Sequence, residues 1–157
     1  MIEANEIHKL FHSLGKTLGS VESFTGGLFA KEITAIPGAS NFYKGGLVTY
    51  ATEEKNRLLG ISYDDINRYG VVSEEIACLM AGNARQILNV DYCVSFTGNA
   101  GPIPMENKPV GEVYVGFATP TETKAFKLML KGDRETIQRE GVRNALFILK
   151  QIISQNN

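Results

Sequence analysis

A turn between a strand and a helix combines hydroxyl side chains with glycines in the stretch Glu22-Ser23-Phe24-Thr25-Gly26-Gly27. Residues 17–22 before it are typical of a strand, and residues 28–36 after it are typical of a helix. Glycine lets a backbone approach a ligand closely, and the first amides of a helix lack partners and carry partial positive charge. Such a turn can hold a phosphate or the oxyanion of an acyl-transfer reaction. A plain helix cap explains the same residues equally well, because Ser and Thr are common caps.

Lys55 is a second residue whose position indicates chemistry. It lies in the first turn of a short helix expected over residues 53–59, after the capping residue Thr52. A cation is unfavourable there, because the N-terminal end of a helix prefers anions. A functional role is one interpretation, and a surface ion pair with Glu53 or Glu54 is the other.

Arg134 follows the expected cap Asp133 in the first turn of the last helix, so it is also a cation at an unfavourable helix end. One interpretation is a guanidinium that binds an anionic group of a ligand. The other is a surface ion pair with Glu135 or Asp133.

A second glycine-rich loop follows a strand expected over residues 92–96. Its residues are Thr97, Gly98, Asn99, Ala100 and Gly101. Ligands of open α/β sheets gather at the carboxyl ends of strands, so this loop and the first turn are expected to share a site. Neither matches the phosphate-binding pattern GxxxxGK[ST] or the dinucleotide pattern GxGxxG.

Helices and strands alternate along the chain, which predicts an α/β fold. Helices are expected over residues 3–14, 28–36, 53–59, from Ser73 to about residue 88, and from Asp133 to near the end; strands are expected over 17–22, 41–51, 92–96, 113–118 and 126–131, the last two antiparallel. Residues 62–69 are expected to form a turn or a short helix. No repeat or linker interrupts the chain, so we expect one domain over residues 1–157.

Composition narrows the classes of function. The formal net charge of -1 gives no basic excess for nucleic acid or an anionic membrane, and no apolar stretch approaches a membrane span. The chain begins without an apolar signal core, so a cytoplasmic location is expected, with Cys78 and Cys93 reduced and buried. His8 and His12 have metal-ligand spacing but no third ligand nearby, so we expect no metal site.

Eight motifs in one order resemble the C-terminal domain of the CinA family, the competence-damage-inducible proteins, which includes stand-alone nicotinamide-nucleotide amidases. The resemblance covers residues 5–153 and rests on Ser23-x-Thr25-Gly26-Gly27, Pro37-Gly38-Ala39-Ser40, Gly45-Gly46-Leu47-Val48-Thr49-Tyr50, Lys55 with Leu59-Gly60, Gly70-Val71-Val72-Ser73-Glu74-Glu75, Thr97-Gly98-x-Ala100-Gly101-Pro102, Lys108-Pro109-Val110-Gly111-x-Val113-Tyr114 and Gly132-Asp133-Arg134.

The resemblance implies a three-layer α/β/α domain with a mixed sheet. It also implies hydrolysis of the carboxamide of nicotinamide mononucleotide to nicotinate mononucleotide and ammonia, with no metal and no cofactor. The catalytic set of the family corresponds to Ser23, Tyr50 and Lys55. The substrate-binding positions are expected at Thr25, Gly26, Gly27, Gly46, Thr97, Gly98, Asn99, Ala100, Gly101 and Arg134. Family precedent favours a homo-oligomer whose ligand is a small nucleotide.

The chemistry of an amide hydrolase suits these residues. In our hypothesis Ser23 attacks the carboxamide carbon, and a buried, neutral Lys55 takes its proton. Tyr50 orients the lysine or relays the proton to the leaving ammonia. The amides of Gly26 and Gly27 hold the oxyanion. Thr25 is a rival nucleophile that the sequence leaves open.

Several residues depart from the family pattern. Phe24 stands where cysteine is usual, Asn99 replaces an aliphatic residue, and Gln138 stands where a second arginine is common. The segment 103–105 replaces a pair of glycines. These changes leave two alternatives to the amidase: a hydrolase of a related amide, and a weakly active module that binds a pyridine nucleotide or a protein partner linked to competence or DNA damage.

Overall fold

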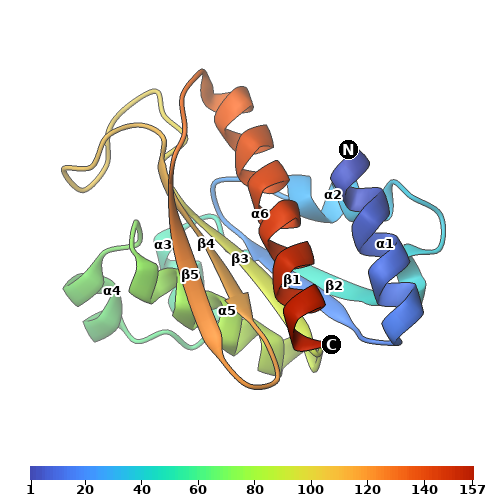
Figure 1. The fold of residues 1–157 in the computed structure, drawn as a ribbon. Helices are drawn as coiled ribbons and strands as arrows, with labels where there is room; N and C mark the ends of the chain where they lie inside the picture. The colour runs from blue at the N-terminus through green and yellow to red at the C-terminus, as the bar shows by residue number, and fades with distance from the viewer.

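The central strands are buried along their whole length, so a layer of helices must cover each face of their sheet. The computed structural model describes residues 1–157 and shows this arrangement (Figure 1). The helices are α1 (Ile2–Leu14), α2 (Leu28–Thr34), the short 3-10 helix η1 (Ala39–Asn41), α3 (Thr52–Arg57), α4 (Tyr63–Tyr69), α5 (Glu74–Leu88) and α6 (Arg134–Asn156). The strands are β1 (Leu18–Glu22), β2 (Tyr43–Val48), β3 (Tyr92–Gly98), β4 (Glu112–Ala118) and β5 (Thr123–Met129).

The sheet has the strand order β2-β1-β3-β4-β5. Strand β1 pairs in parallel with β2 and β3, and β3, β4 and β5 pair antiparallel. The carboxyl ends of β1, β2 and β3 therefore meet at one edge of the sheet. The segments that follow these strands carry many of the residues singled out from the sequence, whereas Arg134 lies at the start of α6.

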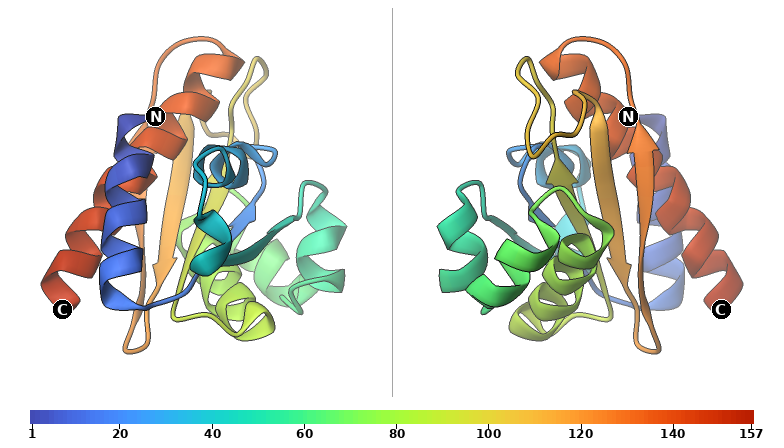
Figure 2. Two further views of the ribbon diagram at one scale, coloured as in Figure 1. Left: turned by 90° about the vertical axis from the view of Figure 1, so that its right-hand side faces the viewer. Right: turned by 90° about the vertical axis from the view of Figure 1, so that its left-hand side faces the viewer.

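Two apolar clusters fill the space between the three layers. In β3, the even-numbered residues Val94 and Phe96 pack toward α1, α2 and α6, whereas Cys93 packs toward α4 and α5. Figure 2 shows α1 and α6 on one face of the sheet and α3, α4 and α5 on the other. The predicted three-layer fold with a mixed sheet is confirmed.

Helix caps were predicted with mixed success. Ser73 caps α5 by accepting from the amide of Ile76, and Asp133 caps α6 by accepting from the amide of Thr136. The prediction that Thr52 caps α3 is wrong. The cap position is Ala51, whose extended backbone precedes a helix that starts at Thr52 and has no side-chain cap.

The histidines considered for metal binding and the two cysteines show no sign of a metal or redox site. His8 is buried, and its Nε2 donates to the carbonyl of Ile33 at 2.8 Å. No group of three or more metal-ligating side chains occurs in the structure. Cys78 and Cys93 are both free, and burial raises the pKa of the Cys93 thiol. None of the helices combines the length and apolar character of a membrane span.

Gly116 allows α5 to lie close to the sheet. A Cβ at this position of β4 would lie 2.6 Å from the carbonyl oxygen of Ala77 and still closer to the hydroxyl of Ser95. We therefore expect Gly116→Ala to lower the free energy of unfolding by about 1–3 kcal/mol through overpacking. Urea denaturation measures this change.

Gly82 provides the matched control, because it lies within α5 and a Cβ there would meet nothing nearer than 3.8 Å. Gly82→Ala is expected to stabilise the chain by about 0.5–1 kcal/mol, since alanine loses less backbone entropy in a helix. Equal effects of the two substitutions would contradict the close approach of α5 to β4.

Candidate active site

The carboxylate of Glu22 organises the turn between β1 and α2. It is buried and accepts hydrogen bonds from the hydroxyl of Thr25 at 2.7 Å, the amide of Phe29 at 2.9 Å and the amide of Ala30 at 3.1 Å. An anion is stabilised at the first amides of a helix, so Glu22 fixes the start of α2. Ser23, the next residue, donates its amide to the carbonyl of Phe96 in β3. Sequence analysis missed this role, although an acid just before a helix start was its signal.

Lys55 is buried beside Ser23. Its side chain is 1% exposed, and its Nζ lies 2.7 Å from the carbonyl oxygen of Thr49 and 3.1 Å from the Oγ of Ser23. Burial lowers the pKa of Lys55 from 10.5 to about 8, and Glu53 opposes part of that effect. The structure therefore brings together a hydroxyl and an amine that loses its proton far more readily than an exposed lysine.

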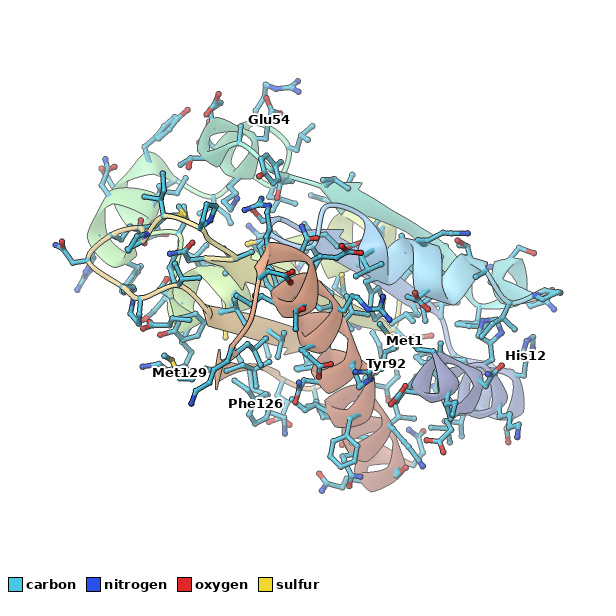
Figure 3. The ribbon with its side chains drawn as sticks, turned by 90° about the horizontal axis from the view of Figure 1, so that it is seen from above. Met1, His12, Glu54, Tyr92, Phe126 and Met129 are labelled. Carbon is cyan, nitrogen blue, oxygen red and sulfur yellow. The ribbon has the colours of Figure 1, made fainter.

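The alternative of a surface ion pair for Lys55 is wrong. Glu54 lies at the outer edge of the molecule (Figure 3) and pairs with Arg57 at 2.6 Å. No carboxylate lies within ion-pair distance of the Lys55 Nζ. An amine that is buried with a hydroxyl and a carbonyl as its only partners suits proton transfer rather than charge neutralisation.

Tyr50 makes no hydrogen bond with Lys55. Its side chain is 59% exposed, and its hydroxyl accepts a hydrogen bond from the Arg134 guanidinium at 2.6 Å. Successive side chains of an extended segment point to opposite sides. Thr49 faces inward, so Tyr50 is directed outward and toward α6. The expectation that Tyr50 orients the lysine is corrected on this geometry.

The turn residues after Ser23 point away from it. The hydroxyl of Thr25 donates to Glu22, and the amide of Gly26 donates to the carbonyl of Ser23 at 3.0 Å, so Gly26 has no free amide for an oxyanion. Thr25, Gly26 and Gly27 line a separate cavity of about 540 Å³. The amides of Phe24, Thr25 and Gly27 make no hydrogen bond within the chain, so the predicted donor Gly27 keeps a free amide. The amides of Phe24 and Thr25 are closest to Ser23 along the chain and are also candidate oxyanion donors.

A cavity of about 330 Å³ lies next to Ser23, between the β1–α2 turn, the loop after β3 and the start of α6. Its lining residues are Ser23, Phe24, Tyr50, Gly98, Asn99, Ala100, Gly101, Pro102, Ile103, Met105 and Arg134. Seven of the predicted site residues are among them. Sequence analysis did not assign the apolar wall of Phe24, Ile103 and Met105 to the site, because apolar side chains in a loop carry no specific chemical signal.

Two predicted binding residues lie outside both cavities. Thr97 is buried in β3 and donates its hydroxyl to the carbonyl of Val71 at 2.6 Å. Gly46 lies in β2 opposite Ser20, where a Cβ would collide with the hydroxyls of Ser20 and Tyr43 at 2.6 Å. Both residues therefore serve packing of the sheet rather than the cavity wall.

Arg134 is the one charged residue that lines the cavity. Besides Tyr50, its guanidinium donates to the carbonyl of Gly101. The interpretation as a surface ion pair with Glu135 or Asp133 is wrong, because the guanidinium bonds to Tyr50 and Gly101 and to neither carboxylate. The Asp133 carboxylate instead accepts a hydrogen bond from the amide of Thr136, and this bond lowers the pKa of Asp133. Arg134 thus links the start of α6 to two other segments of the cavity wall.

Two residues that depart from the family pattern contact each other. The amide Nε2 of Gln138 donates to the carbonyl of Phe24 at 2.9 Å. The Phe24 ring is buried against Phe96 and over Gly141, where an added Cβ would lie 2.8 Å from the ring. Gln138 and Phe24 therefore join the turn that carries Ser23 to α6 by a neutral contact.

The burial of Lys55 predicts a pH-dependent change in stability. Its pKa is about 8 in the folded chain and 10.5 ordinarily, so between these values the unfolded chain holds more protons and stability rises with pH. The free energy of unfolding of the wild type relative to Lys55→Met is expected to increase by about 2 kcal/mol from pH 7 to pH 10. Urea denaturation at a series of pH values measures it.

The exposed residue Lys9 of α1 supplies the control for that series. The stability of Lys9→Met relative to the wild type is expected to stay constant over the same range, because the Lys9 side chain is exposed to solvent in the folded chain as in the unfolded one. A constant difference for Lys55→Met as well would place the Lys55 amine in water and away from Ser23.

Comparison with known proteins shows which family the chain resembles. The model of the CinA C-terminal domain matches residues 2–153. A relative from Geobacillus sp. (strain WCH70) is 44% identical over 146 residues, which is 92% of this chain and 35% of the relative. A CinA-like protein of Petrotoga mobilis is 41% identical over 139 residues, 88% of this chain and 34% of that protein. The chain thus spans about a third of the length of these relatives.

Solved structures agree with the fold in detail. The competence/damage inducible protein CihA from Agrobacterium tumefaciens superposes with a TM-score of 0.91 at 32% identity, covering 99% of this chain and 94% of that one. A competence or damage-inducible protein from Enterobacter asburiae superposes with a TM-score of 0.94 at 27% identity, covering 96% of each chain. The match of the family model over nearly all residues shows that the chain belongs to the CinA C-terminal domain family.

Proposed function

We propose that the chain hydrolyses the carboxamide of nicotinamide mononucleotide, with Ser23 as nucleophile and Lys55 as general base. The observation that carries this proposal is the buried Lys55 amine, which lies 3.1 Å from the Ser23 hydroxyl and has no carboxylate partner. A module that only binds a ligand has no physical need for such an amine. Serine–lysine pairs are a known variant of the catalytic triad.

The proposed reaction proceeds through an ester on Ser23. Neutral Lys55 accepts the proton of the Ser23 hydroxyl while Oγ attacks the carboxamide carbon. The Lys55 ammonium then protonates the leaving nitrogen, the C–N bond breaks, and ammonia departs. Water, deprotonated by Lys55, attacks the ester and releases nicotinate mononucleotide with Ser23 restored. The unpaired amides of Phe24 and Thr25 are the candidate donors to the oxyanion.

The cavity supplies contacts for the other parts of such a substrate. Phe24, Ile103 and Met105 provide apolar surface for a pyridine ring. Arg134 at the start of α6 is the candidate for the phosphate, through its guanidinium. Tyr50 has its hydroxyl on Arg134, so in this proposal it orients the cation that holds the phosphate rather than the lysine.

A binding module with little turnover is the second candidate function. The observation in its favour is that Arg134 is the one cation of the cavity, and its guanidinium already donates to Tyr50 and Gly101. Gln138, where the family pattern has a second arginine, adds no charge. A doubly charged phosphate is then held less strongly than in a site with two free cations.

Ammonia release from nicotinamide mononucleotide tests the proposed reaction. Ser23→Ala and Lys55→Met are each expected to lower kcat by about 1,000-fold or more, because nucleophile and base act as one unit. Lys9→Met on the exposed face of α1 is expected to match the wild type. Binding of the nucleotide without ammonia release by the wild type would favour the binding module.

Thr25→Val separates the two hydroxyls of the turn. It removes the bond to Glu22 but leaves Ser23 beside Lys55, so it is expected to reduce ammonia release far less than Ser23→Ala. The opposite order of the two activities would assign the nucleophile to Thr25.

The pH profile tests the base. Since Lys55 must be neutral to accept a proton and its pKa is about 8, kcat/KM is expected to rise with pH by about tenfold from pH 7 to pH 9 and then level off. Steady-state rates of ammonia release at fixed ionic strength measure the profile. A profile that is flat over this range would exclude Lys55 as the base.

A further inference from the structure

The side-chain amide of Asn99 has a hydrogen-bond partner for its oxygen but none for its nitrogen. The residue directly follows β3, lines the cavity next to Ser23 and is 2% exposed. Its Oδ1 accepts a hydrogen bond from the amide of Gly101 at 2.9 Å. Because a backbone amide can only donate, this contact fixes which end of the side chain is oxygen. The Nδ2 is buried and has no acceptor.

Hydrogen bonds also fix the backbone of Asn99. Its amide donates to the carbonyl of Glu112 at 3.1 Å, and its carbonyl accepts from the amide of Gly111 at 2.8 Å. A rotation of the side chain that brought Nδ2 to another acceptor would break the bond between Oδ1 and the amide of Gly101. The Nδ2 exposes less than 1 Å² of its surface, so it is out of reach of bulk solvent.

An unpaired buried donor is costly and rare. Leaving one without an acceptor costs about 1–3 kcal/mol, and such groups in native proteins usually have a functional explanation. In this chain only one other buried side-chain atom, the hydroxyl oxygen of Thr49, lacks a partner, and Thr49 does not line a cavity. Asn99 is thus the one lining residue whose side chain has a buried donor without a partner.

We propose that Asn99 determines the specificity of the cavity by donating from Nδ2 to the carbonyl oxygen of the substrate carboxamide. The inference rests on the proposed function, because it names the group on that substrate. Nδ2 is enclosed before the ligand arrives, so the contact requires a movement of the cavity wall on the scale of a side chain, as is common on binding.

Charge decides which part of the substrate Asn99 contacts. The phosphate carries the negative charge and is drawn to Arg134, the only charged lining residue. A neutral, enclosed amide suits an uncharged acceptor, whose burial costs far less than that of an anion. The carboxamide must also lie at Ser23 to react, and Ser23 and Asn99 line the same cavity. The carbonyl oxygen is the acceptor that meets both conditions.

Two ligands and two variants isolate this contact. The ligands are nicotinamide mononucleotide and the analogue in which hydrogen replaces the carboxamide. The variants are Asn99→Leu, which removes the donor with little change in size, and Asn99→Asp, which removes the donor but keeps an acceptor for Gly101. All proteins carry Ser23→Ala, so that titration calorimetry measures binding without turnover. Both ligands contain the phosphate, so effects on phosphate binding cancel in the ratio of their Kd values.

The protein with Asn99 intact is expected to prefer the carboxamide ligand by about tenfold, the worth of one hydrogen bond of typical strength. Both Asn99 variants are expected to lose that preference. A preference that both variants retain would overturn the role of Asn99, while ammonia release by the chain with Ser23 intact would still support the amidase. Binding of neither ligand would overturn both the nucleotide substrate and the contact. Binding with the expected preferences but without hydrolysis would support Asn99 and refute the amidase.

Discussion

The burial of one amine without a counter-charge is the constraint on which the candidate site depends. Lys55 reaches Ser23 only because β1 and β2 are parallel neighbours whose ends coincide, with Glu22 opposite Val48 and the amide of Thr49 donating to the carbonyl of Glu22. The chain then turns into α3 and directs the lysine back between Thr49 and Ser23. Any carboxylate in that space would pair with the amine and raise its pKa, which would remove the neutral base that the proposed chemistry needs.

The cost of this site is concentrated in a small region, and the rest of the fold offsets it. The buried Lys55 and the unpaired Nδ2 of Asn99 both reduce stability. Lys55 lies in the helix after β2 and Asn99 directly follows β3, and these are the two strands that flank β1. Apolar clusters on the two faces of the sheet supply the compensating burial. The clustering of unfavourable groups at one edge of a well-packed sheet is typical of functional sites, where local consistency is given up for chemistry.

Much of the fold and the central pair of the site were predictable from the sequence, because they depend on local patterns. Alternating apolar residues located β3 and β4, and a lysine at an unfavourable helix position pointed to Lys55. Contacts between segments far apart in the chain were not predictable. The partner of Tyr50 is Arg134, 84 residues away, and no local pattern connects them. The glycines of the turn resembled an oxyanion hole, but a tight turn directs successive residues to different sides, so Gly26 and Gly27 face another cavity.

The three residues that depart from the family pattern all have uncharged side chains. Gln138 places a neutral amide against the backbone of Phe24, and in the cavity next to Ser23 Asn99 contributes a neutral amide and Phe24 an apolar ring. Arg134 is the only charged residue that lines this cavity. Discrimination in such a site comes from hydrogen-bond geometry more than from net attraction. A site built to hydrogen-bond a substrate group rejects analogues that lack it, because a buried protein group is then left unpaired. The unpaired donor of Asn99 gives this cavity the means for that kind of selection, and the bond between its Oδ1 and the amide of Gly101 holds the side chain in place.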